Sequence, residues 1–97
     1  MNISPGVASE ADTIGYWCHI HSPLDCWSMY ETLTDGLIAA KRERREALAA
    51  HDHDRADRAL QEIGDLTALC AAAAEGLVLM RLRYFAAGHQ WPLARLR

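Results

Sequence analysis

The chain has 97 residues, a formal net charge of −3 and a hydrophobic fraction of 51%, and this length suits a single domain. Its charged fraction of 24% argues against a disordered chain. The slightly negative net charge argues against binding to polyanions by bulk electrostatics. Alanine supplies much of the hydrophobic content and there is a single Phe, so the composition favours helix over sheet.

The ends and the cysteines of the chain bear on its location. The N-terminus lacks a basic segment followed by an apolar core, which is the pattern of a secretory signal. The most apolar stretch, residues 66–80, is too short to span a bilayer and contains Glu75. Three cysteines are an odd number for a disulfide framework. We therefore expect a cytoplasmic protein with reduced thiols and no membrane partner.

Residues 1–22 contain the apolar and aromatic run Tyr16-Trp17-Cys18-His19-Ile20. We expect this N-terminal segment to pack on the rest of the chain, residues 23–97. The first clear helix start follows it, because Ser22 is a good N-cap, Pro23 suits the first helical position and Asp25 suits the first turn.

Apolar residues then recur every three or four positions, which predicts a helix over about residues 23–51. The predicted stripe is Cys26, Tyr30, Leu33, Leu37, Ala40, Arg44 and Ala47. Asp35-Gly36 is its weak point, and the sequence leaves open whether the helix breaks there.

A polar turn at residues 51–54 separates this helix from a second one over about residues 55–87. Asp54, followed by Asp57, predicts the N-terminus of the second helix. Gly88 and Pro92 predict its end. Its apolar stripe is the most regular in the chain: Ala56, Ala59, Ile63, Leu66, Cys70, Ala73, Leu77, Met80, Tyr84 and Ala87.

A short turn between two long helices predicts an all-α fold, a long antiparallel helical hairpin. This fold places the acidic residues of 10–35 beside the arginines of 81–97. The second helix also carries a second stripe, which one hairpin leaves uncovered: Ala71, Ala74, Val78, Leu82 and Phe85. We expect residues 1–20 to cover part of it and dimerisation into a four-helix arrangement to cover the rest.

One cluster of the sequence has the chemistry of a metal site. Thiolates and imidazoles are the ligands that zinc prefers, and the hairpin brings the end of the second helix near the start of the first. The candidate zinc ligands are Cys18, His21, Cys26 and His89. The alternative is that Cys26 is a core residue and the histidines are ordinary surface residues, since the spacing matches no standard zinc pattern.

Aromatic residues occur near both ends of the chain, and arginines gather near the C-terminal end. The candidate partner-binding residues are Tyr16, Trp17, Arg81, Arg83, Tyr84, Trp91 and Arg95. Such a mixture suits a protein interface, and it also suits single-stranded RNA, where bases stack on rings and guanidinium groups meet phosphates. A third interpretation is a basic tail that neutralises the acidic N-terminal part.

The sequence carries no phosphate-binding glycine loop, no HExxH motif and no recognisable set of nucleophile and base. We therefore expect no enzyme and no cofactor other than the possible zinc ion. The favoured hypothesis is a small helical interaction module, homodimeric, that regulates or inhibits a protein partner and is encoded by a phage or mobile element. The alternatives are a zinc-stabilised regulator and an RNA-binding hairpin dimer that uses the C-terminal arginines.

Overall fold

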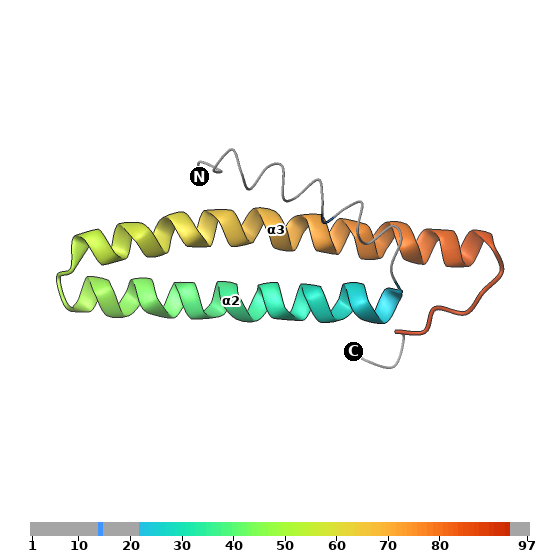
Figure 1. Ribbon diagram of the computed structural model, residues 1–97, viewed down its shortest axis with the longest axis horizontal. Coiled ribbons are helices and arrows are strands. Elements are labelled where there is room, and N and C mark those ends of the chain that lie inside the picture. Colours follow the sequence, from blue (N-terminus) through green and yellow to red (C-terminus); the bar gives the residue numbers. More distant parts are fainter. Residues whose placement is uncertain (1–13, 15–21, 94–97) are drawn as a thin grey trace.

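The computed structural model describes residue 14 and residues 22–93, which form two long helices packed against each other. Helix α2 spans Pro23–Ala49 and helix α3 spans His53–Ala86. The two run in opposite directions side by side and are joined by a short turn (Figure 1). The described residues contain no strand, so the predicted all-helical hairpin is confirmed for them.

Helix α2 begins where the sequence predicts. The backbone N–H of Asp25 donates to Oγ of Ser22 at 3.2 Å, and Pro23 occupies the first helical position. The serine thereby satisfies one of the backbone donors that a helix leaves unpaired at its start. Asp25 adds a negative charge where the helix dipole favours it.

The turn between the helices lies two residues earlier than predicted, and Asp54 is not the N-cap of α3. His51 adopts a left-handed φ of 57°, and the N–H of Asp52 donates to the carbonyl of Ala47 at 2.9 Å, which closes the end of α2. The side chain of Asp52 then accepts from the backbone N–H of Arg55 at 3.1 Å, so α3 begins at His53. The predicted bounds of 23–51 and 55–87 are corrected accordingly, because Asp52 rather than Asp54 satisfies the first free donor.

Helix α3 ends in a glycine cap, as predicted. Gly88 has φ of 76°, and its N–H donates to the carbonyl of Phe85 at 3.0 Å. The N–H of His89 donates to the carbonyl of Tyr84 at 2.8 Å. This pair of bonds is the Schellman arrangement, which ends a helix and turns the chain away from its axis. Ala87, the last residue of the predicted stripe, is the C-cap and is exposed.

Small side chains line most of the contact between α2 and α3, which we call the α2–α3 seam. The stripes predicted from periodicity form it, and Leu69 joins them as a buried residue that those stripes did not include. The largest fully buried side chain among the described residues is that of Cys26. The alanines buried in the described part are Ala40, Ala47, Ala56, Ala59 and Ala73.

The two helices contact each other at several levels along the seam. At one end Cys26 and Met80 pack together, with Ile14, Leu77 and Trp91 partly buried against them. Further along, Gly36 faces Leu66. Helix α2 continues through Gly36 without a break, which settles the point that the sequence left open. Packing against Leu66 across the seam stabilises the helix at this position, although glycine is a poor helix former.

Replacing Asp52 with Ala tests the observed cap of α3. We expect the free energy of unfolding to fall by about 1 kcal/mol, because the N–H of Arg55 loses its acceptor. Chemical denaturation followed by circular dichroism measures this change. Asp54→Ala is the matched control and should cost less, since Asp54 only contributes charge in the first turn. Equal losses in the two variants would show that neither residue is the specific cap.

Replacing Gly36 with Ala should stabilise the protein by about 0.5–1 kcal/mol, because alanine is the better helix former. A methyl group at this position would lie 3.6 Å from Cδ1 of Leu66, which is ordinary van der Waals contact. Thermal denaturation measures the effect. Gly88→Ala is the control with the opposite sign, since its positive φ strains any other residue. A loss of stability in Gly36→Ala would mean that the seam is too tight there for a methyl group.

Candidate functional site

The chain after α3 folds back along the hairpin toward the start of α2 (Figure 1). Leu93 is buried, and Trp91 packs partly buried against Cys26 and Met80. The rings of Trp91 and Tyr84 meet edge to face, with centroids 5.3 Å apart and an interplanar angle of 89°. Such aromatic pairs add to the stabilisation that burial provides. The tail up to Leu93 is therefore part of the folded structure.

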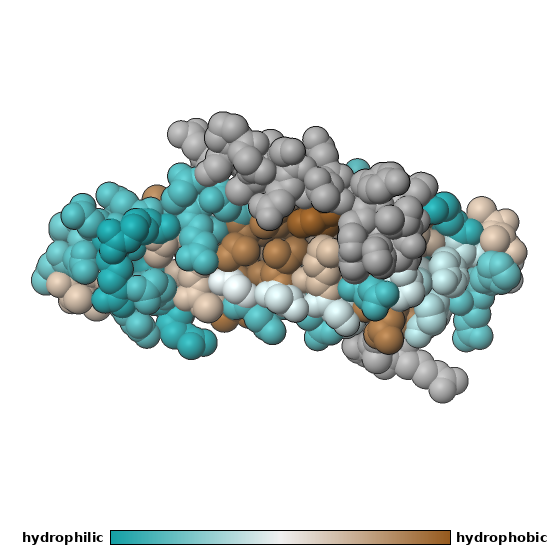
Figure 2. Space-filling model, in the orientation of Figure 1, coloured by the Kyte–Doolittle hydropathy of each residue, from teal (hydrophilic) through white to brown (hydrophobic). Residues whose placement is uncertain are grey.

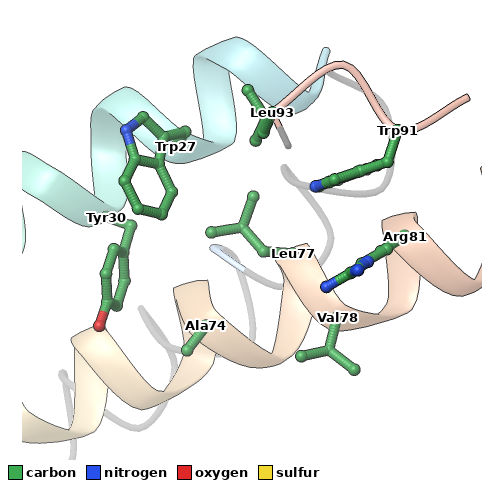
Figure 3. A pocket seen from close by; sticks show the side chains of 8 residues that line it. All are labelled: Trp27, Tyr30, Ala74, Leu77, Val78, Arg81, Trp91 and Leu93. Atoms are coloured by element: carbon green, nitrogen blue, oxygen red, sulfur yellow. The ribbon is translucent and has the colours of Figure 1, made fainter. Parts of the chain in front are cut away.

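A groove of about 540 Å³ opens between the start of α2, the second half of α3 and this returning tail. Its walls are mostly aromatic and aliphatic, and Arg81 is the charged residue among the described ones that line it. Leu77 points into the space below Trp27, whereas Val78 points outward from α3 (Figure 3). The lining residues are Trp27, Tyr30, Ala74, Leu77, Val78, Arg81, Trp91 and Leu93.

Next to the groove, α3 exposes bulky apolar side chains to solvent. Val78 and Leu82 are each 59% exposed and Phe85 is 61% exposed. With Ala71 and Ala74, which are exposed and half-buried, these residues form the second stripe that the sequence predicts. We call these five residues the α3 apolar face. A contiguous apolar surface on a small protein marks a site of contact with another molecule.

One arginine, Arg81, borders the α3 apolar face. The guanidinium carbon of Arg81 lies 5.6 Å from the ring centroid of Phe85, which is a cation–π contact. Arg83 is also exposed on α3. The contact with Phe85 keeps the Arg81 side chain along the helix surface, where its aliphatic part extends the apolar face and its charge sits at the edge.

The opposite end of the hairpin is charged. Arg55, in the first turn of α3, pairs with Glu43 of α2 and lies 3.7 Å from a carboxylate oxygen of Glu46. The hydrogen bond from Arg55 lowers the pKa of Glu43, and the same bond raises the pKa of Arg55. Figure 2 shows hydrophilic residues covering this end, with hydrophobic residues nearer the middle. The most exposed apolar side chains of α3 thus lie toward the other end, whereas Leu48 and Leu60 are less exposed near the turn.

The described residues hold only half of the predicted zinc site. Cys26 is fully buried beside Met80, and His89 is exposed, with its ring 6.1 Å from that of Tyr84. Cys18 and His21 lie outside the described residues. Within the described part, no three His, Cys, Asp or Glu side chains are grouped so that they could hold a metal ion. The four-residue zinc site stays a prediction.

The predicted partner-binding residues that the structure describes differ in their burial and contacts. Tyr84 and Trp91 pack against each other and hold the returning tail, whereas Arg81 and Arg83 are exposed. Tyr16, Trp17 and Arg95 lie outside the described residues. Sequence reasoning did not single out Trp27 or Leu93, both of which line the groove. Their place depends on how the tail folds back, and no periodic pattern signals that.

By length and composition alone, α3 could also cross a membrane. A window of 18 residues within it has a mean hydropathy of 1.6, and 39% of that window is buried inside the structure. The core helix of a soluble protein can have the same length and hydropathy. This finding is weak evidence beside the packing of α3 against α2.

No protein-family model matches the sequence, and no curated protein or solved structure is significantly similar to it. The function therefore has to be inferred from the fold, the groove and the α3 apolar face.

The ion pair at the charged end predicts a pH dependence. Because the pKa of Glu43 is lower in the folded protein, the pair stabilises the fold above the usual pKa of a glutamate, about 4.3. This contribution is lost as the pH falls through the folded pKa. We expect Glu43→Gln to weaken the decline in stability below about pH 5, measured by denaturation at several pH values. Glu62→Gln is the control on the same hairpin, and an identical pH profile for the two variants would contradict this role for Glu43.

Proposed function

We propose that the chain is a non-enzymatic helical interaction module that regulates or inhibits a macromolecular partner, and that its contact partner is another protein. The observation that carries the proposal is the exposure of Val78, Leu82 and Phe85 in one row on α3. Transfer of such side chains from water into an interface is favourable at roughly 25 cal/mol per Å² of apolar surface.

The surroundings of this row favour a protein partner. A protein–protein interface typically has an apolar centre and a polar rim, and it is enriched in arginine and aromatic residues. The α3 apolar face has Arg81 at its edge, and the adjoining groove has Trp27, Tyr30 and Trp91 in its walls. A helix from a partner fits such a surface, because the exposed residues recur with the spacing of a helix face.

Homodimerisation into a four-helix arrangement belongs to the same proposal. A hairpin of two helices leaves one side of each helix without a partner, and pairing two hairpins covers those sides. In a cytoplasmic protein this assembly would present the surface that the pairing leaves exposed to a regulated partner. The location in the cytoplasm is part of the proposal.

Site-specific photo-crosslinking in the producing cells tests the proposal. A photoreactive phenylalanine derivative in place of Leu82 should give covalent adducts with protein of defined mass. The same substitution at Glu62, on the exposed surface of α3 away from the groove, is the control and should give none. Mass spectrometry of the adducts separates a second copy of this chain from a different protein.

The outcome that would contradict the proposal is the absence of protein adducts at Leu82, or equal adducts at both positions. Adducts with RNA would favour the RNA-binding alternative, and adducts with lipid would favour insertion of α3 into a membrane.

A further inference from the structure

The α3 apolar face has a symmetric spacing about its central residue. Leu82 and Phe85 follow Val78 by four and seven residues, and Ala74 and Ala71 precede it by the same numbers. The whole row lies within one continuous helix and borders the groove at Ala74 and Val78. A rotation by 180° about an axis through Val78, perpendicular to the helix, therefore exchanges position 71 with 85 and position 74 with 82.

The sizes of the side chains break this symmetry in a specific way. The half of the face before Val78 carries only the methyl groups of Ala71 and Ala74, whereas the half after it carries Leu82 and Phe85. The two bulky residues are 59% and 61% exposed, so nothing in the hairpin itself fills the space beside them. A well-packed interface places large side chains opposite small ones.

We infer that the α3 apolar face binds the same face of a second copy, with the two α3 helices antiparallel and centred on Val78. This inference rests on the proposed interaction function and names its first partner. In this register Phe85 of each copy shares a layer with Ala71 of the other. Leu82 likewise shares a layer with Ala74, and the two Val78 side chains meet at the axis. The contact is isologous, which is the usual symmetry of a homodimer.

A parallel pairing of the same faces packs poorly. It would place Phe85 against Phe85 and Leu82 against Leu82 at one end, and alanine against alanine at the other. The bulky end would hold the helices apart, and the alanine end would then leave a gap. The distribution of side-chain sizes along α3 therefore selects the antiparallel arrangement.

Charge favours the same register. Cys26 lies level with Met80 and Gly36 with Leu66, so the level of Glu75 on α3 corresponds to the region of Tyr30 on α2. In the antiparallel pair, Arg81 of the second copy comes to this level. The first half of α2 carries Asp25, Glu31 and Asp35 and has no basic residue before Lys41. Opposite charges thus come to the same level in the two copies, and long-range electrostatics support the pairing.

Disulfide trapping tests the register, because a disulfide forms only where two Cβ atoms come within about 3.5–4.5 Å. The variants are made in a background with Cys18→Ser and Cys70→Ala, and buried Cys26 is kept. Val78→Cys should form a covalent dimer on mild oxidation, since this position meets its own copy at the axis. A mixture of the Ala74→Cys and Leu82→Cys proteins should form the mixed dimer, which a size tag on one of them identifies.

Leu82→Cys alone is the matched control. Its two copies lie eight helical positions apart along the axis, about 12 Å, so it should not form a covalent dimer with itself. Efficient self-linking at Leu82 would show a parallel pairing and overturn the inference. Each background protein is first compared with the wild type by circular dichroism and sedimentation, so that loss of folding is not mistaken for loss of pairing.

Sedimentation of the wild type separates this inference from the proposed function. A dimer that Leu82→Gln reduces to a monomer supports the inference. A wild type that stays monomeric at all accessible concentrations overturns it. In that case photo-crosslinking at Leu82 to a different protein would leave the interaction function standing, and the absence of any protein adduct would remove both.

Discussion

The close contact of α2 and α3 along a seam lined by alanine is the feature on which the rest of the structure depends. Buried alanines follow one another along both helices, and Cys26 is the largest fully buried side chain in the described part. Small side chains let two helices approach closely and favour helix formation. They also bury little apolar surface per residue, so the seam contributes less to stability than one filled with leucine would.

Several bulky apolar side chains of α3 lie outside the seam, whereas Ile63, Leu69 and Met80 are buried. Val78, Leu79, Leu82 and Phe85 are each more than half exposed, close to the end where the tail returns. Helix α3 presents one side to α2, and Val78, Leu82 and Phe85 lie on a side that α2 leaves exposed. The edge-to-face contact of Trp91 with Tyr84 fixes the tail beside the row and completes the groove. The described residues thus combine a seam rich in small side chains with an outer row of large ones on α3.

Local signals in the sequence predicted most of the fold. Ser22 and Pro23 fixed the start of α2, Gly88 fixed the end of α3, and the three-four spacing identified the buried side of each helix. The turn was mispredicted by two residues because Asp52 and Asp54 are equally good caps by residue type. The left-handed conformation of His51 decides between them, and periodicity does not reveal it.

The candidate site was predictable only in part. The exposed row on α3 followed from a second stripe in the sequence, since a helix with two apolar sides needs two partners. The groove did not follow, because it requires Trp91 and Leu93 to return to the start of α2, and this is a tertiary contact of a segment without periodic structure. For the same reason the sequence placed Tyr84 on the apolar stripe and named Trp91 as a partner-binding candidate, but it did not predict that the two rings pack against each other.

The central claim is that the hairpin obtains part of its stability from a second chain on the outer row of α3. Chemical unfolding of the purified protein over about a hundredfold range of protein concentration tests it most directly, because only an associating protein has a concentration-dependent midpoint. We expect the midpoint to rise with concentration in the wild type and to become independent of it in Leu82→Gln. A wild-type midpoint that does not change with concentration would show that the alanine seam and the returning tail stabilise the single chain by themselves.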